Sequence, residues 1–167
     1  MNLRPAIAED LPHILDLNQK ALPHVSSVGL SDIQRFFELA AYFKVINDAE
    51  NAIKGFLIGL RPGLDYTSDN YRWFNNNFED FLYIDRIVIA EDSRGLGLGS
   101  VLYNDAIEIA RLGVPRLTCE VNSLPPNPQS MSFHENLGFV PVGSQQTEGG
   151  TKEVTLLSLE LDQLSIS

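Results

Sequence analysis

A glycine-rich run between a strand-like and a helix-like segment places the strongest constraint on how this chain can fold. Residues 81–90 have the near-continuous apolar character of a buried strand, and residues 97–112 carry apolar side chains at helical spacing. Between them lies the run Arg94-Gly95-Leu96-Gly97-Leu98-Gly99-Ser100. A strand, glycine turn and helix in this order direct backbone N–H groups and the positive end of the helix into one concavity. The run therefore predicts an anion-binding turn in a protein with mixed helices and strands.

Two familiar phosphate-binding motifs fit this turn poorly. A dinucleotide-binding turn needs a third glycine where Ser100 stands. That turn also follows its strand closely, whereas Arg94 lies five positions beyond Ile89. Glu120 does lie where that fold has its ribose-binding acid. A P-loop needs a lysine directly before Ser100, and the chain has Gly99 there. The structural alternative is a helix start with incidental glycines, which would each destabilise the element by about 0.5–1 kcal/mol relative to alanine.

Hydrophobic periodicity and turn residues predict a mixed α/β domain that spans residues 1–167. Asp10 and Ser31 are expected to cap the first two helices. Residues 61–80 are expected to form a long functional loop that is rich in aromatic side chains. Strands are predicted at 2–6, 42–47, 52–60, 81–90, 116–122, 139–146 and 152–161, and helices at 11–21, 31–40, 97–112 and 129–137.

Composition and charge narrow the possible partners. The 167 residues are 44% hydrophobic and carry a formal net charge of -10, which disfavours nucleic acid and anionic membranes. The charge suits a cationic substrate such as an amine, but the stronger alternative is an acidic surface that serves solubility. No apolar run is long enough to span a bilayer, the first residues lack the features of a signal peptide, and Cys119 is the single cysteine. A cytoplasmic location is the resulting expectation. No metal site is expected, because no cysteine or carboxylate lies at ligand spacing.

The glycine run resembles the Q/R-x-x-G-x-G/A signature of the GNAT N-acetyltransferases. The segment Asn127-Pro-Gln-Ser-Met-Ser-Phe-His-Glu-Asn-Leu-Gly-Phe139 is similar to a second element of that family, N-x-x-A-x-x-x-Y-x-x-x-G-F. The resemblance implies a mostly antiparallel sheet of six to seven strands flanked by about four helices, in the order β-α-α-β-β-β-α-β-α-β-β. It also implies transfer of an acetyl group from acetyl-CoA to the primary amine of a small molecule or a peptide N-terminus.

The resemblance assigns cofactor-binding residues to three segments. Ile87, Val88 and Ile89 form the strand edge that pairs with the pantetheine arm in this family, and the Val88 or Ile89 N–H is the candidate donor to the oxyanion. The turn Arg94 to Ser100, with Leu96 and Leu98 between its glycines, is expected to hold the pyrophosphate. Asn127 and Ser130 are the candidates in the second element.

Three residues are candidates for proton transfer. Glu120 resembles the base of ribosomal-protein N-terminal acetyltransferases, and the alternative is an ordinary strand-end acid that is hydrogen-bonded or solvated. Asp85 is the rival, as a base, an amine anchor or one member of a structural pair, and the side chain of the adjacent Arg86 is expected on the opposite face. His134 stands where the family usually has a tyrosine acid, so it could exchange a proton or simply pack.

Aromatic side chains between residues 66 and 83 are the candidates for the acceptor side. Tyr71, Trp73, Phe74 and Tyr83 could enclose an amine through cation–π contacts. They could equally complete the core or form an interface, and a homodimer is therefore one possible assembly. The competing function on the same fold is a non-catalytic acyl-CoA-binding regulator.

Overall fold

The computed structural model describes residues 1–162, and in that part of the chain it contains seven strands and five α-helices. The elements are β1 (Asn2–Pro5), α1 (Leu11–Lys20), α2 (Leu30–Leu39), β2 (Tyr42–Asn47), β3 (Ile53–Leu60), α3 (Asp69–Asn77), β4 (Leu82–Ile89), α4 (Leu98–Ala110), β5 (Arg116–Leu124), α5 (Pro128–Leu137), β6 (Val140–Thr147) and β7 (Lys152–Glu160). All seven predicted strands and all four predicted helices are confirmed to within a few residues, and α3 is additional.

The strands are hydrogen-bonded in the order β1-β2-β3-β4-β5-β7-β6. The β1–β2, β2–β3, β5–β7 and β6–β7 pairs are antiparallel, and β4 and β5 are parallel, with Leu82 opposite Leu117 and Tyr83 opposite Thr118. The predicted fold class, a mostly antiparallel mixed sheet, is therefore confirmed. Contacts divide the chain into two compact units, of which the first comprises Met1–Leu60 with Ile84–Glu108 and the second Arg61–Tyr83 with the residues from Ile109 onward.

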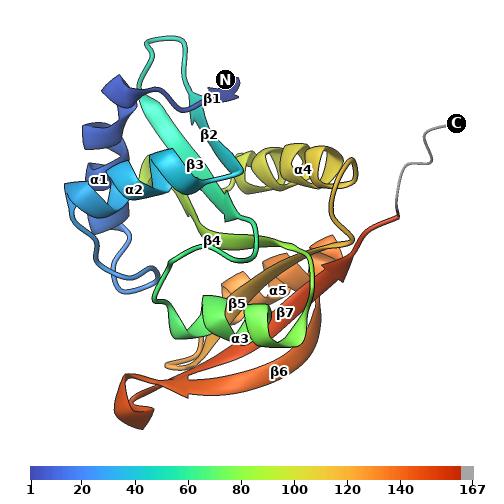
Figure 1. Ribbon diagram of the computed structural model, residues 1–167. Helices are drawn as coiled ribbons and strands as arrows, with labels where there is room; N and C mark the ends of the chain where they lie inside the picture. Colours follow the sequence, from blue (N-terminus) through green and yellow to red (C-terminus); the bar gives the residue numbers. More distant parts are fainter. Residues whose placement is uncertain (163–167) are drawn as a thin grey trace, which may run out of the picture. The chain divides into compact units, whose positions relative to one another are not determined.

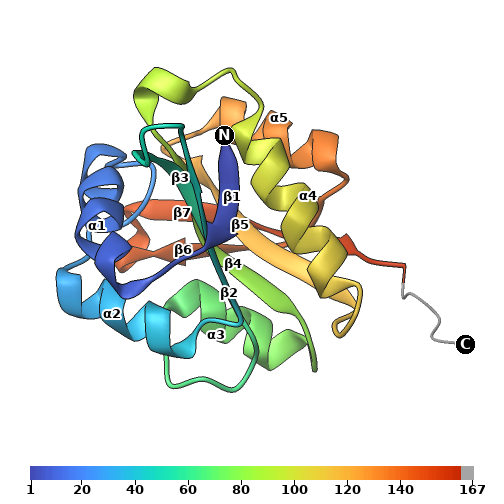
Figure 2. The same cartoon turned by 90° about the horizontal axis from the view of Figure 1, so that it is seen from above.

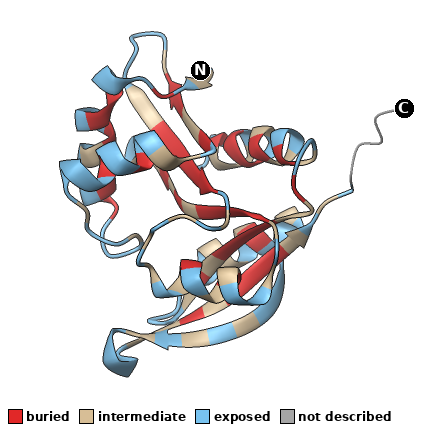
Figure 3. Ribbon diagram, in the orientation of Figure 1, coloured by how far each residue is buried: buried red, intermediate tan, exposed pale blue. Residues whose placement is uncertain are grey.

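In the first unit, helices cover both faces of the strands. Helices α1 and α2 lie on one face of β1–β3, and α4 lies on the other (Figures 1 and 2). The inward residues recur at the helical and strand periods that the sequence predicts. The buried stretches of these elements are red in Figure 3. The buried residues include Ile14, Ile33, Phe36, Val45, Ile46, Phe56, Leu57 and Ile58.

Of the two predicted helix caps in this unit, Asp10 stands at the N-cap of α1, and Ser31 does not stand at the N-cap of α2. Helix α2 begins at Leu30 with Gly29 as its N-cap, and Asp32 accepts the Gly29 N–H at 2.8 Å, so Ser31 is not the cap. Asp10 makes no side-chain cap bond to α1. Its carboxylate instead accepts the Ile7 N–H at 2.9 Å and forms an ion pair with Arg4 at 2.7 Å. Asp10 and Asp32 each accept a backbone N–H three residues earlier in the chain. The preference of single residues for the N-cap position does not predict this pattern.

In the second unit, residues 61–80 are not the loop that the sequence predicted. Ser68 accepts the Tyr71 N–H and starts helix α3, which lies on one face of β5–β7 while α5 lies on the other (Figures 1 and 2). The Trp73 indole packs directly over Gly143 on β6, and Gln145 donates to Asn70 at 3.1 Å. The alternation of polar and aromatic residues here therefore encodes one amphipathic helix with a buried aromatic side.

We expect the contact between Trp73 and Gly143 to be sensitive to a single methyl group. A Cβ on Gly143 would lie 2.6 Å from Cζ2 of Trp73, so Gly143→Ala should lower the free energy of unfolding by about 1–3 kcal/mol through overpacking. Gly113→Ala is the matched control, because no atom lies within 4 Å of its Cβ position. Urea denaturation of the two variants measures the difference, and equal stabilities would contradict this packing.

Candidate functional site

The glycine turn has a backbone that side-chain-bearing residues rarely adopt. Gly95 and Gly97 have φ of 79° and 80°, and no protein atom lies within 4 Å of the Cβ position of either. Helix α4 starts directly afterwards at Leu98, and its first turn includes the bond from Val101 N–H to Gly97 O at 3.1 Å. Backbone geometry, and not crowding, therefore requires glycine at these two positions. The space outside the turn is open, as an anion-binding turn at a helix N-terminus requires.

The remaining residues of the turn differ in exposure. Leu96 is 63% exposed, Arg94 is exposed, and Gly99 and Ser100 are half-buried, whereas Leu98 is buried and fixes the start of α4. Arg94 Nε donates to Ile89 O at 3.4 Å, which is a long bond for a guanidinium. The Arg94 side chain is therefore held loosely beside the end of β4, where a phosphate oxygen would offer it a stronger partner.

The end of β4 shows which backbone groups face away from β3. The Ala90 N–H donates to Lys54 O at 2.8 Å, so successive N–H groups alternate between the two edges from that point. Val88 then presents its backbone to β3, and its carbonyl lies 3.1 Å from the Cβ position of Gly55. Ile89 and Ile87 present theirs to the opposite edge. Of the two predicted oxyanion donors, Ile89 is therefore the one whose N–H points away from β3.

Asp85 lies in a structural pair. Its side chain is 3% exposed, and Arg86 Nε donates to Asp85 Oδ2 at 2.7 Å. The expectation that the Arg86 side chain points away from Asp85 is therefore wrong, because a long guanidinium can bend back around the strand to a neighbouring carboxylate. This contact favours the structural reading of Asp85 over a role as a base.

Glu120 is joined to a buried tyrosine. The Tyr83 hydroxyl lies 2.9 Å from Oε1 and 2.7 Å from Oε2 of Glu120, and Tyr83 itself is fully buried. Tyr83 pairs with Thr118 in the parallel register of β4 and β5. Glu120 lies two residues beyond Thr118 on β5, so the Glu120 and Thr118 side chains lie on the same face of the sheet. Glu120 is half-buried, so a carboxylate at this position is fixed by a neutral donor and still accessible to solvent.

His134 is buried on helix α5, between the rings of Phe133 and Phe139. Its Nδ1 lies 2.8 Å from Ser130 O and 3.4 Å from Ser130 Oγ. Burial lowers the pKa of His134 from its usual value, and the bond to the Ser130 carbonyl offsets part of that change. A neutral ring that donates from Nδ1 to a carbonyl has an unprotonated Nε2, so in this state Nε2 of His134 can act only as a hydrogen-bond acceptor.

The buried state of His134 predicts a pH dependence of stability. Because the folded pKa lies below the unfolded value of about 6.5, protonation favours the unfolded chain and stability falls as pH drops through 6.5 toward the folded pKa. Between pH 7.5 and 5.5 we expect His134→Phe to lose less stability than the wild type. Urea denaturation at both pH values measures this, with the exposed His13→Gln as control. A His134→Phe protein with the wild-type pH slope would contradict the prediction.

Asn127 and Ser130 lie at the start of α5. Asn127 is the N-cap of this helix, and its side chain accepts the Ser130 N–H at 3.3 Å. Ser130 then connects to His134 one helical turn later. Local helix geometry therefore joins three of the sequence-predicted residues into one cluster in the second unit.

The predicted acceptor-side aromatics are mostly interior. Tyr71, Phe74 and Tyr83 are fully buried. The centre of the Tyr83 ring lies 5.5 Å from that of Tyr71 and 5.7 Å from that of Phe74. The Tyr71 hydroxyl donates to Arg61 O at 2.6 Å. These contacts support the core-packing alternative for Tyr71 and Phe74, while Trp73 is half-buried over Gly143. Tyr83 contacts Glu120, a role that sequence reasoning did not assign to it because strand pairing was unknown.

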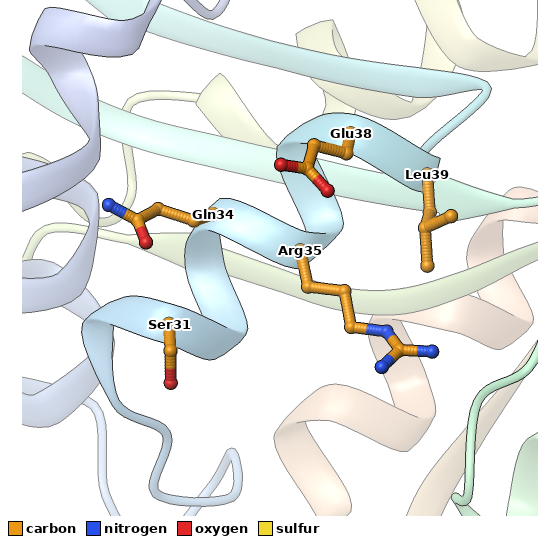
Figure 4. A pocket seen from close by; sticks show the side chains of 5 residues that line it. All are labelled: Ser31, Gln34, Arg35, Glu38 and Leu39. Carbon is orange, nitrogen blue, oxygen red and sulfur yellow. The ribbon is translucent and has the colours of Figure 1, made fainter.

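A shallow hollow of about 330 Å³ lies on helix α2 and contains none of the predicted site residues (Figure 4). Its lining residues are Ser31, Gln34, Arg35, Glu38 and Leu39. In residues 1–162, no group of three or more histidine, cysteine or acidic side chains is arranged to hold a metal ion. No helix in the same range is long and apolar enough to cross a membrane.

A mixed sheet whose fourth strand leads through a glycine turn into a helix defines an α/β protein with a turn of the kind that binds anions. Residues 13–139 match the acetyltransferase (GNAT) family, and the chain belongs to that family. The peptidyl-lysine N-acetyltransferase YjaB of Escherichia coli (strain K12) is 34% identical over 77 residues, which are 46% of this chain and 48% of that protein. The chain thus matches about half the length of this relative.

Solved structures with the same fold cover nearly the whole chain. The ribosomal-protein-S18-alanine N-acetyltransferase of Escherichia coli has a TM-score of 0.74 at 16% identity, over 98% of this chain and 96% of that one. Naa20 of Chaetomium thermophilum, solved with a bisubstrate analogue, has a TM-score of 0.76 at 16% identity, over 96% and 87%. The yncA protein of Salmonella typhimurium, solved with acetyl-CoA, has a TM-score of 0.72 at 20% identity, over 100% and 97%. At these identities the likeness establishes the fold.

Proposed function

We propose that this protein transfers the acetyl group of acetyl-CoA to a primary amine by direct attack in a ternary complex. Membership of the acetyltransferase (GNAT) family supports the reaction class. The observation that carries the proposal is the turn with positive φ at Gly95 and Gly97 immediately before α4, which leaves open space at a helix N-terminus. These residues fit a cofactor with a pyrophosphate, because main-chain donors and the helix dipole both favour negative charge there.

The proposed cofactor contacts follow from the orientation of the backbone. The turn from Arg94 to Ser100 holds the pyrophosphate, and the edge of β4 that carries Ile87 and Ile89 pairs with the amide groups of the pantetheine arm. Asn127 and Ser130 are the further proposed cofactor-binding residues. Acetyl-CoA supplies an activated thioester, and the Ile89 N–H donates to the carbonyl oxygen as negative charge develops on it.

Glu120 is the proposed general base. An amine must lose its proton before its nitrogen can attack the thioester carbon, and the carboxylate of Glu120 takes that proton directly or through water. The Tyr83 hydroxyl holds the carboxylate in place at 2.7–2.9 Å. As the new C–N bond forms, the C–S bond breaks and the sulfur leaves as a thiolate, which then takes up a proton from the site or from solvent.

His134 is proposed to assist without donating the proton to sulfur. In the neutral ring the Nδ1 proton is donated to Ser130 O, so Nε2 carries no proton and can only accept a hydrogen bond. A tyrosine at this position would present a hydroxyl donor instead. His134 therefore departs from the tyrosine pattern of the family, and a packing or accepting role fits its burial between two rings.

The acceptor is proposed to be a small molecule or a peptide with a free primary amine. The net charge of -10 favours the approach of a cation. The names of two similar proteins specify a peptidyl lysine and an alanine of ribosomal protein S18 as acceptors, so lysine peptides and alanine peptides both belong in a substrate panel.

The direct test is amine-dependent release of thiol from acetyl-CoA. We expect a panel of small amines, lysine peptides and peptides with free N-termini to contain at least one acceptor, and its N-acetyl product should appear in mass spectra in equal amount. Binding of acetyl-CoA without turnover on any amine would instead support the regulatory alternative.

A further inference from the structure

The Arg94 side chain contacts the same edge of β4 that the proposed function gives to the cofactor. Its Nε donates to Ile89 O at 3.4 Å. Because the Ala90 N–H pairs with Lys54 O on β3, the backbone of Ile89 points to the opposite edge of the strand, where the pantetheine arm is proposed to pair. One carbonyl oxygen is therefore the acceptor for two donors, the guanidinium of this chain and an amide N–H of the cofactor.

A short 3₁₀ turn, Glu91–Ser93, brings Arg94 back to the end of β4. The Ser93 N–H donates to Ala90 O at 2.9 Å, and the Arg94 N–H donates to Glu91 O at 3.4 Å. Ser93 is buried, so the turn is fixed from its inner side. The backbone of Arg94 is held by these bonds, while its side chain is exposed and reaches the strand edge.

The Arg94 guanidinium uses few of its donors. Among residues 1–162, Ile89 O is the one hydrogen-bond acceptor that it contacts. The neighbouring carboxylate of Asp92 forms an ion pair with Lys54 at 3.0 Å and none with Arg94. A charge-assisted bond to a phosphate oxygen is stronger than a 3.4 Å bond to a neutral carbonyl. An anion bound at the glycine turn would therefore draw the guanidinium away from Ile89.

We propose that Arg94 couples the two halves of the cofactor site, an inference that rests on the proposed binding of acetyl-CoA. In the absence of an anion at the glycine turn, the guanidinium occupies Ile89 O and competes with the pantetheine arm. When a pyrophosphate binds at the turn, the guanidinium moves to it and leaves the edge of β4 open. The two halves of the cofactor then bind cooperatively, and the coupling is the same in both directions.

The coupling makes Arg94 a specificity-determining residue for the acetyl donor. The apparent affinity of a ligand falls with the fraction of molecules that are competent to bind it. One hydrogen bond of ordinary strength changes such an equilibrium by about 2–10-fold. A thioester without a pyrophosphate cannot displace the guanidinium, so the contact with Ile89 O disfavours acetyl groups carried on simpler thiols.

The affinities of two thioesters for the wild type and for Arg94→Met test the coupling. We expect the variant to bind acetyl-CoA about 10-fold or more weakly, because it loses a charged donor to the pyrophosphate. The same variant should bind S-acetylpantetheine, which lacks the pyrophosphate, about 2–10-fold more tightly than the wild type does. Arg72→Met changes an exposed arginine on α3 and should alter neither Kd. Calorimetric and NMR titrations measure the four affinities and the control.

Inorganic phosphate gives a second readout. In the wild type, saturating phosphate should strengthen the binding of S-acetylpantetheine about 2–10-fold at constant ionic strength, because the anion draws Arg94 away from the strand edge. In Arg94→Met the same addition should have no effect.

Three outcomes overturn the proposal. Unchanged or weaker binding of S-acetylpantetheine to Arg94→Met shows that the guanidinium does not compete for the strand edge, and it leaves the proposed function intact. Wild-type binding of S-acetylpantetheine that does not respond to phosphate refutes the coupling in the same way. A wild type that does not bind acetyl-CoA refutes the proposed function, and the coupling falls with it.

Discussion

Replacing Glu120 with glutamine should lower kcat/KM for the acceptor amine by about 10²–10⁴-fold, which corresponds to about 3–5 kcal/mol of transition-state stabilisation. The amide keeps the size of the side chain and can still bond to the Tyr83 hydroxyl, but it cannot take a proton from the attacking amine. The Kd of acetyl-CoA should stay within about twofold, because Glu120 acts on the acceptor. Steady-state kinetics and calorimetric titration of acetyl-CoA measure the two effects separately.

Two companion variants sharpen this result. Glu135→Gln makes the same chemical change at an exposed position on α5 and should leave the kinetics unchanged. Tyr83→Phe removes the hydroxyl that favours the ionised carboxylate, so the acid limb of the profile of kcat/KM against pH should move to higher pH. Full activity of Glu120→Gln would show that another group or solvent accepts the proton. An unshifted acid limb in Tyr83→Phe would show that the hydroxyl does not influence the base.

Replacing Gly97 with valine should weaken acetyl-CoA binding by about 100-fold or more. A β-branched residue at φ of 80° is a severe backbone outlier, so the turn must adopt another conformation and its N–H groups no longer point into one concavity. The loss of two charge-assisted hydrogen bonds is worth about 3–6 kcal/mol, which is ample for this change. Calorimetric titration of acetyl-CoA gives the Kd directly.

Gly149→Val is the matched control for backbone strain. Gly149 has φ of 68° and, like Gly97, no atom within 4 Å of its Cβ position, but it lies in the β6–β7 turn. Both variants should lose about 1–2 kcal/mol of stability, and only Gly97→Val should lose acetyl-CoA. Equal acetyl-CoA affinities in the two variants would contradict the assignment of the turn.

Much of the fold could be predicted because its signals are local. The apolar run before the glycine turn, and Gly113, Pro115 and Gly138 at helix ends, mark element boundaries through backbone chemistry alone. Residues 61–80 misled the prediction, because Pro62, Gly63 and many Asp and Asn residues resemble a loop. Helix α3 forms there since burial of Tyr71 and Phe74 outweighs a weak helix propensity.

The contacts of the site residues could not be predicted, because they depend on pairing between distant segments. The bond between Tyr83 and Glu120 requires the parallel register of β4 and β5, which no local pattern specifies. Arg86 is a similar case. A cation inside an apolar strand signals a buried partner, but Asn18 and Ser26 are found only when α1 packs against β4.

The most direct test of the central claim is a stoichiometric assay of the wild-type protein with acetyl-CoA and the amine panel. Free thiol and N-acetyl product are measured in the same reactions, with N-terminally blocked peptides that lack lysine as negative controls. Acetyl transfer predicts equal amounts of the two products, both dependent on a free amine and both reduced at least 100-fold in Glu120→Gln. Tight binding of acetyl-CoA with no amine-dependent thiol release would contradict it.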